Sequence, residues 1–220
     1  LLPQVQQLRA DFGIGELVMV GDRGMIGQQA IAQMRAADGI QWITALKSAS
    51  IRALVEQGQL QLGLFDERNL FEFSSPDYPH ERLVACRNEE LGKLRAHKRE
   101  ALLDATSKEL EKVRTMVERG GLRSAGKIGL RAGRVVNKYK VAKHFELTIE
   151  DARFDFALRK DKIAAEAALD GIYVIRTSVP PARLRAEDAV RSYKQLSQVE
   201  RAFRSLKTID LEVRPIHHRL

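Results

Sequence analysis

The chain has 220 residues, 44% of them hydrophobic and 30% charged, which is enough for one sizeable core or for a core with an inserted subdomain. A net charge of +8 with only 6% aromatic residues favours an acidic partner such as nucleic acid over an oily ligand. No apolar run approaches the roughly 20 residues of a membrane span and the N-terminus lacks a secretory pattern, so we expect a cytoplasmic protein without membrane contact.

The N-terminal part of the chain alternates between helical and extended patterns. Residues 17–20 are a continuous apolar run, as expected of a strand covered on both faces, and they follow a glycine-rich turn. We expect helices at 1–10, 26–37 and 50–57, and a second strand at 41–46. This order of strands and helices predicts an α/β sheet.

Asp22 lies directly after the first apolar strand, where ligand sites of open α/β sheets are found. As a structural residue it would close the turn or cap the helix that starts near Ile26. A dinucleotide-binding fingerprint does not fit, because the glycines at 21, 24 and 27 have the spacing G-x-x-G-x-x-G and lack the close-approach glycine. A third interpretation is that Asp22 is a catalytic carboxylate.

The middle of the chain carries a different set of patterns. Residues 70–86 predict a β-hairpin with a longer loop, and residues 88–119 predict a long polar helix with a partial apolar stripe. We then expect a second hairpin at 144–158, a helix at 163–169 and a strand at 170–176, before two prolines break the chain at 180–181. The single cysteine, Cys86, excludes an internal disulfide and matches no zinc spacing, so we expect it in the core.

The densest basic segment runs from Arg119 to Lys143, with eight Lys or Arg residues and no acidic residue. One interpretation is a solvated face, and the other is a surface that follows DNA phosphates, with Arg131, Arg134 and Lys138 as candidate contacts. Tyr139 is the one aromatic residue of this segment, so neither base stacking nor sequence readout is predicted.

Residues 193–207 predict a helix that carries polar and apolar groups on separate arcs. At about 100° per residue, one narrow stripe collects the side chains of Tyr193, Leu196, Glu200, Arg204 and Lys207. An adjacent apolar arc (Val199, Phe203, Leu206) is expected to dock on a core, which places Glu200 at the edge of the buried face. The simplest alternative is a solvated pair between Glu200 and Arg204, four residues apart.

Two of these segments together resemble a known family. The pattern Tyr193-x2-Leu196-x3-Glu200-x6-Lys207 resembles the Y-x2-R-x3-E-x6-K signature of bacterial insertion-sequence transposases of the DDE type. The segment VGDRGM around Asp22 is similar to the D-R-G segment of these transposases, and residues 138–178 look like the region before the signature. The signature arginine is Leu196 here, so no DNA contact is assigned to this position.

The resemblance implies a partial ribonuclease-H-like core, a mixed sheet with flanking helices, interrupted by a large α+β insertion. Because 177 residues separate Asp22 from Glu200, we expect the second half of the core at 1–63, the inserted subdomain at 64–182 and the Glu200 helix at 183–220. The first catalytic aspartate of the family is expected on a strand before Leu1, so we expect the chain to be part of a longer protein.

The resemblance also implies a function. Asp22 and Glu200 would be two of three carboxylates that bind two Mg²⁺ or Mn²⁺ ions, in a transposase that cleaves DNA at element ends and joins it to target DNA. Tyr193, Arg204 and Lys207 would contact the substrate phosphates, with Arg23 as a further candidate. Such transposases commonly work as dimers, which adds a second copy of the chain as a partner. One alternative is a DNA-binding remnant without catalysis, and another is a nuclease that shares the same core.

Overall fold

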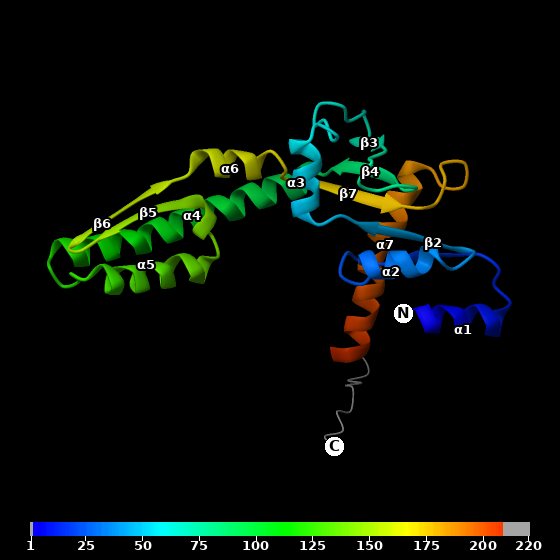
Figure 1. Cartoon of the computed structure of the whole chain (residues 1–220), viewed down its shortest axis with the longest axis horizontal. Coiled ribbons are helices and arrows are strands. Elements are labelled where there is room, and N and C mark those ends of the chain that lie inside the picture. Colours follow the sequence, from blue (N-terminus) through cyan, green and yellow to red (C-terminus); the bar gives the residue numbers. More distant parts are fainter. Residues whose placement is uncertain (1, 209–220) are drawn as a thin grey trace, which may run out of the picture. The chain divides into compact units, whose positions relative to one another are not determined.

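The structure, a computed structural model, describes residues 2–208 of the chain. It divides into two compact units, which we call the sheet unit (Leu1–Arg87 with Tyr173–Leu220) and the helical unit (Asn88–Ile172). Figure 1 labels the elements of both units along the chain. Each unit has its own buried core.

The sheet unit is built on a five-stranded mixed sheet with the strand order β1-β2-β7-β4-β3. Strand β1 pairs in parallel with β2, β2 pairs antiparallel with β7, and β3 pairs antiparallel with β4. The strands are β1 (Leu17–Val20), β2 (Ile40–Ala45), β3 (Leu70–Phe73), β4 (Arg82–Arg87) and β7 (Ile172–Thr177). The parallel pair β1 and β2 requires a crossover, which helix α2 (Gln28–Arg35) provides.

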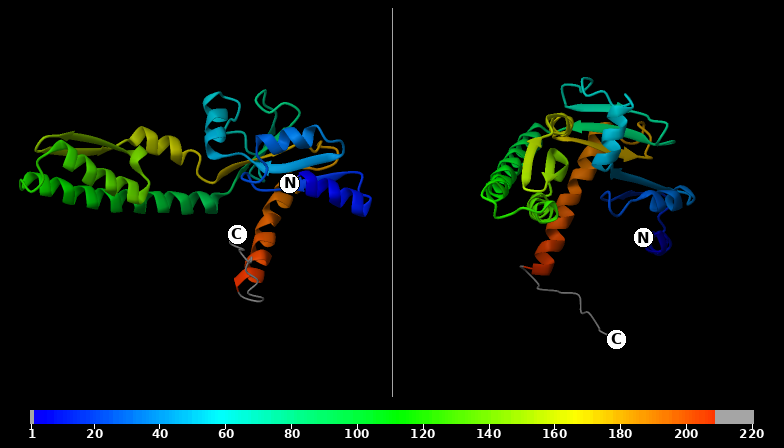
Figure 2. Two further views of the ribbon diagram at one scale, coloured as in Figure 1. Left: turned by 60° about the horizontal axis from the view of Figure 1, so that its bottom comes forward. Right: turned by 60° about the vertical axis from the view of Figure 1, so that its left-hand side comes forward.

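Helices cover both faces of this sheet. Alternate residues of β2 point to opposite faces, so Trp42 packs with α1 (Leu2–Phe12) and α2, whereas Ile43 packs with the start of α7 (Ala186–Thr208). A third helix, α3 (Ser48–Glu56), follows β2 and buries Ile51 and Leu54. Figure 2 shows α7 leaving the sheet, so that only its first part lies against the strands.

A buried ion pair connects three strands of the sheet unit. The side chain of Glu81, just before β4, is fully buried and accepts hydrogen bonds from Arg176 Nε (2.6 Å) and from Trp42 Nε1 (3.2 Å). The Arg176 guanidinium also lies over the Tyr78 ring, 4.7 Å from its centroid. A buried charge without a partner is strongly unfavourable, so these contacts fix the register of β2, β4 and β7 together.

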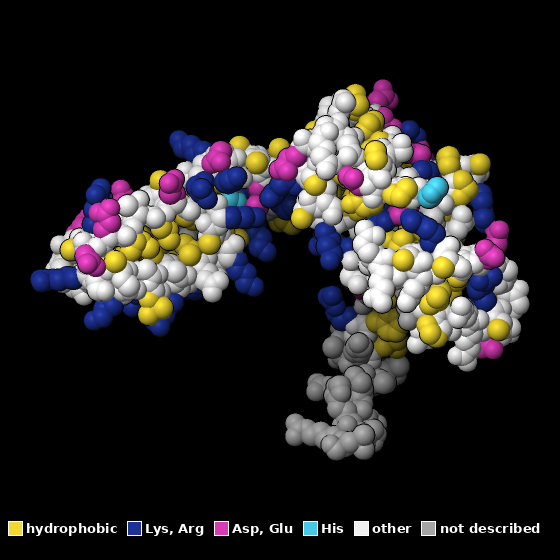
Figure 3. All heavy atoms as spheres, viewed as in Figure 1, with side chains coloured by type: hydrophobic (Ala, Val, Ile, Leu, Met, Phe, Trp, Pro, Cys, Tyr) yellow, Lys and Arg dark blue, Asp and Glu magenta, His cyan; other side chains and the backbone are white. Residues whose placement is uncertain are grey.

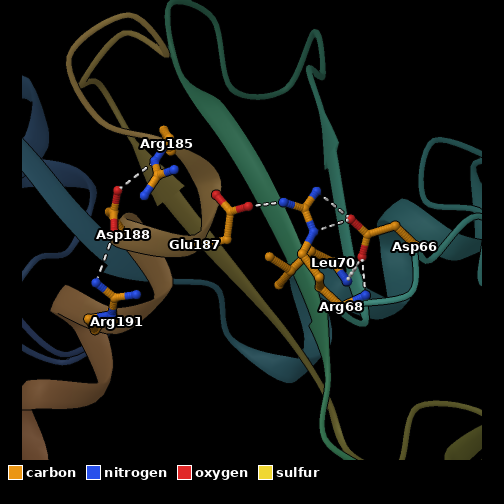
Figure 4. A network of polar contacts seen from close by, with 7 residues as sticks. All are labelled: Asp66, Arg68, Leu70, Arg185, Glu187, Asp188 and Arg191. Atoms are coloured by element: carbon orange, nitrogen blue, oxygen red, sulfur yellow. Dashed lines mark hydrogen bonds and ion pairs between the residues drawn. The ribbon is translucent and has the colours of Figure 1, made fainter.

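The first turn of α7 is tied to the loop before β3 by a polar network (Figure 4). Asp66 accepts hydrogen bonds from the Leu70 amide and from the Arg68 side chain, and Arg68 pairs with Glu187 of α7. Asp188, also in that turn, pairs with Arg185 and Arg191. The start of α7 is thereby held at the β3 side of the sheet.

The helical unit packs two helices against a two-stranded hairpin. Its elements are α4 (Glu89–Glu118), α5 (Ala125–Tyr139), a short 3-10 helix (Ala142–His144), β5 (Phe145–Glu150), β6 (Arg153–Leu158) and α6 (Lys160–Ala167). Asn88 caps α4 by accepting a hydrogen bond from the Leu91 amide (3.0 Å). Apolar residues at helical spacing on α4 and α5 meet Phe145 and Phe154 of the hairpin to form the core.

Several expectations from the sequence are confirmed and others are corrected. The two hairpins, the long helix and the buried Cys86 are present as predicted. The helical unit spans residues 88–172, within the range expected for the inserted subdomain at 64–182, and β3, β4 and β7 belong to the sheet of the other unit. Strand β1 is also not covered on both faces, since Val18 is 36% exposed within the described part of the chain. No helix among residues 2–208 is long and apolar enough to span a membrane.

Candidate active site

Asp22 is positioned by a tight turn at the carboxyl end of β1. Its Oδ1 accepts hydrogen bonds from the amides of Gly24 (2.9 Å) and Met25 (2.7 Å), and its carbonyl accepts one from the Ile26 amide. Asp22 therefore does close the turn, although α2 begins six residues later, after Gly27. In the part of the chain that the structure describes, its second oxygen, Oδ2, makes no hydrogen bond and stays available to a ligand.

Steric constraints explain two of the three glycines around Asp22. A Cβ atom at Gly21 would come within 2.8 Å of the buried Ile26 side chain, and one at Gly24 would lie 3.3 Å from Asp22 Oδ1. Gly27, in contrast, has open space around its Cβ position. The segment G-D-R-G thus keeps room for the Ile26 side chain on one side and for the Asp22 carboxylate on the other.

Glu200 lies on α7, on the stripe predicted from the sequence. Tyr193 and Leu196 on the same stripe are half-buried, whereas Glu200 and Arg204 are exposed. The helix begins at Ala186, seven residues before the predicted start, because its first turns bury Ala189 and Val190 against the sheet.

Asp22 and Glu200 line one cavity of about 550 Å³. The strand end contributes Val20, Asp22 and Met25 to its wall, and α7 contributes Leu196, Val199, Glu200, Phe203 and Arg204. Two carboxylates with 177 residues between them in the sequence are therefore brought to a common space. Among the described residues, the wall is apolar apart from the two carboxylates and the Arg204 guanidinium.

Tyr193 lies within electrostatic reach of both carboxylates. Burial raises the pKa of its hydroxyl above the ordinary value, and the negative charges of Asp22 and Glu200 raise that pKa further, while Arg23 acts in the opposite direction. The Tyr193 hydroxyl stays protonated at neutral pH, as a tyrosine of ordinary pKa also would, and can donate a hydrogen bond.

The apolar arc of α7 differs from its prediction. Val199, Phe203 and Leu206 are 50%, 58% and 42% exposed, so within residues 2–208 they do not dock on a core. Val199 and Phe203 instead form the apolar wall of the cavity beside Glu200. Glu200 therefore lies on an exposed half of the helix rather than at the edge of a buried face.

The remaining predicted residues lie elsewhere. Arg23 is exposed beside Asp22, and Arg131, Arg134 and Lys138 lie on α5 of the helical unit. The backbone of Lys207 belongs to α7, but its side chain lies outside the described residues. Sequence reasoning missed Met25, which donates its amide hydrogen to Asp22 and lines the cavity, because a lone exposed methionine follows no pattern.

The donor set of the cavity fits a hard divalent cation. Both acidic side chains offer carboxylate oxygens, and none of the described residues that line the cavity is His or Cys, which suits Mg²⁺ or Mn²⁺ rather than Zn²⁺. Across residues 2–208, no group of three or more His, Cys, Asp or Glu side chains is close enough to hold a metal ion. The described part of the chain thus brings two acidic side chains, Asp22 and Glu200, to this cavity.

Fold and cavity define an α/β domain in which a carboxylate at the end of a parallel strand and a carboxylate on helix α7 line one cavity. The family model for the transposase DDE domain matches residues 1–219, and the chain belongs to this family. Transposases of this family are DNA phosphoryl-transfer enzymes, so membership implies DNA as a partner. No curated protein and no solved structure matches the chain.

Proposed function

We propose that Asp22 and Glu200 are two of the metal-binding carboxylates of a transposase that cleaves DNA at the ends of an insertion sequence and transfers the strand to target DNA. The observation that carries the proposal is the common cavity of the two side chains, which come from the end of β1 and from α7. Divalent cations bound by such carboxylates would activate the attacking oxygen and stabilise the leaving oxygen in an in-line phosphoryl transfer.

The residues around the carboxylates suit a phosphate substrate. Arg204 lines the cavity with Glu200, and Arg23 follows Asp22 directly, so cations flank both carboxylates. The Tyr193 hydroxyl, whose pKa is raised by burial from an ordinary value already well above neutral pH, carries its proton and can donate a hydrogen bond to a phosphate oxygen. Lys207 follows Glu200 by seven positions on α7 and is proposed as a further phosphate contact.

The Asp22 turn has a role of its own in this proposal. The Gly24 and Met25 amides hold Oδ1 of Asp22 in place. The orientation of the side chain is therefore fixed, and Oδ2 is the oxygen that would bind a cation. The inserted position of the helical unit between Asp22 and Glu200 is part of the same proposal, with the unit acting as a subdomain of the ribonuclease-H-like core.

The test is strand transfer by the transposase with Asp22→Asn or Glu200→Gln. Both variants keep the side-chain shape and are expected to lower the joining rate by at least about a thousandfold while leaving duplex binding in EDTA intact. Asp11→Asn on α1 and Glu56→Gln on α3 are matched controls, because they remove one carboxylate charge each at exposed positions outside the cavity. Joining at the wild-type rate by Glu200→Gln would refute the assignment.

A second measurement separates an enzyme from a DNA-binding remnant. Mn²⁺ binding, followed by electron paramagnetic resonance, should weaken in both cavity variants and stay unchanged in both controls. Salt-dependent DNA binding without cleavage, together with Mn²⁺ binding that ignores Asp22 and Glu200, would instead support the non-catalytic alternative.

A further inference from the structure

Helix α5 of the helical unit separates apolar from basic side chains. Ile128, Ala132 and Val136 are buried in the core of this unit. The opposite side of the helix carries four exposed cations, which we call the α5 cation row: Lys127, Arg131, Arg134 and Lys138. Figure 3 shows Lys and Arg side chains along the edge of the unit where Figure 1 places α5.

The four cations form a compact row rather than a general scatter of charge. At about 100° per residue, their positions fall within an arc of roughly 60° on the helix. From Lys127 to Lys138 the row extends over about 16 Å at about 1.5 Å per residue. One strand of duplex DNA carries a phosphate about every 3.4 Å of helix axis, so the row matches the length of a few consecutive phosphates.

A comparison with α4 argues against a merely solvated face. On α4, Lys108, Lys112 and Arg114 are each paired with a carboxylate three or four residues away on the same helix. The α5 cation row has no carboxylate on its own helix, and none of its four members forms an ion pair with another residue of the described chain. Glu109 of α4 is the acidic group whose pKa the row affects: the hydrogen bond from Lys112 lowers that pKa most, and the charges of Lys138 and Arg131 add to the effect.

Two hydrogen bonds with the turn of the β5–β6 hairpin hold the start of α5, the helix that carries the cation row. Asp151, in the turn of the β5–β6 hairpin, accepts a hydrogen bond from the Ala125 amide (2.7 Å) at the first residue of α5. In the same turn, the Ala152 amide donates to the Arg123 carbonyl (2.5 Å). The backbone that carries the four cations is thus set before any ligand binds, which lowers the backbone entropy lost on binding.

We infer that the solvent face of α5 is a second DNA site, which binds the sugar-phosphate backbone of duplex DNA independently of base sequence and of the carboxylate cavity. Lys127 joins the three cations predicted from the sequence, since it lies on the same arc. Duplex is favoured over single strands because Tyr139, half-buried with Lys138 over its ring (5.0 Å), is the one aromatic side chain on α5, whereas single-strand binding uses several aromatic residues for base stacking.

The experiment measures DNA binding by the 220-residue chain in EDTA, with a duplex of arbitrary sequence and fluorescence anisotropy between about 50 and 200 mM KCl. Arg131→Ala combined with Arg134→Ala should reduce the slope of log K against log salt by about two, since each lost phosphate contact removes about 0.9. Arg131→Lys with Arg134→Lys should retain the slope, because the charge is kept. Thermal unfolding of each variant checks that the fold is intact.

The matched control is Lys160→Ala with Lys162→Ala, which removes the same charge from exposed positions of α6 in the same unit. The control should leave the slope of log K against log salt unchanged. If the control lowered this slope as much as the α5 variant does, the effect would come from net charge alone, and the inference would be overturned. A single strand of the same sequence should lose much less affinity in the α5 variant than the duplex does. A change in sedimentation without a change in DNA binding would identify the face as a protein interface and also overturn the inference.

Failure of this inference is distinguishable from failure of the proposed catalytic site. Glu200→Gln should keep the full salt slope in EDTA, because Glu200 belongs to the sheet unit and contributes no cation. Loss of strand transfer in Glu200→Gln with an unchanged slope in the α5 variant would reject the second DNA site alone. Loss of slope in the α5 variant with normal joining by Glu200→Gln would reject the catalytic assignment alone.

Discussion

Gly24 shows how a residue without a side chain shapes the candidate active site. Its amide holds Asp22 Oδ1, and a Cβ atom at this position would lie 3.3 Å from the same oxygen, closer than most such contacts. Gly24→Ala should therefore displace the carboxylate by a few tenths of an ångström and lower strand transfer by about tenfold to a hundredfold. Gly27→Ala in the same loop meets nothing within 4 Å and should be nearly neutral. Equal activity of both variants would show that the position of the Asp22 carboxylate does not depend on the space at Gly24.

Glu81 is the residue on which the register of the sheet depends most. Glu81→Gln would leave the Arg176 guanidinium, whose side chain is 8% exposed, without its charged partner. We expect the free energy of unfolding to fall by about 3–5 kcal/mol, the usual effect of breaking a buried ion pair. Urea denaturation measures this loss, and Glu67→Gln, at an exposed position, is the control and should change stability by less than about 0.5 kcal/mol.

Helix α7 divides into a packed first half and an exposed second half. Val190 is 6% exposed and packs on the sheet, whereas Phe203 is 58% exposed. In the 220-residue chain, Val190→Ala should reduce the free energy of unfolding by about 2 kcal/mol, and Phe203→Ala by less than about 0.5 kcal/mol despite the larger side chain removed. Urea denaturation of the two variants measures both effects. A larger effect of Phe203→Ala would mean that this half of the helix is buried.

The loop before β3 links acid stability to the start of α7. The hydrogen bond from the Leu70 amide, followed by that from the Arg68 side chain, lowers the pKa of Asp66 below its ordinary value. A carboxyl group whose pKa is lower in the folded state than in the unfolded state stabilises the fold at pH values above its unfolded-state pKa. This stabilisation is lost as the pH falls through the folded-state pKa. Wild type should thus be more stable than Asp66→Asn near pH 6, and the difference should shrink as the pH falls below the ordinary aspartate pKa of about 3.9. A difference in urea midpoint that stays constant with pH would show that the charge of Asp66 contributes nothing.

At the scale of the whole molecule, the two units have separate cores. Leu110, with no exposed surface, lies in the core of the helical unit, and Leu130 in the same unit is 60% exposed. Leu110→Ala should destabilise by about 3–5 kcal/mol through the cavity it leaves. In hydrogen exchange, amides of 88–172 should lose protection while those of the sheet unit keep it, and Leu130→Ala should change neither. Equal loss of protection in both units would show one cooperative fold.

Local patterns of the sequence were sufficient for most of the elements and for the motifs. Apolar periodicity placed the long helix α4 within a residue at either end and both hairpins at their turns, because these features depend on neighbours a few positions apart. The sequence also contained the two motifs around Asp22 and Glu200 that pointed to the transposase family, and the family model confirms the family. Composition likewise indicated the basic segment at 119–143, but helix α5 within it and the row of cations on one face were not predicted from the sequence.

Only the tertiary structure decided which distant residues meet. It placed β7 between β2 and β4, which moved the boundaries of the helical unit to 88 and 172, because strand pairing depends on contacts far apart in the chain. It also brought Asp22 and Glu200 to one cavity, and it left the apolar arc of α7 exposed where periodicity alone predicted burial. Periodicity determines that a face is apolar, whereas what covers that face depends on how the whole chain packs.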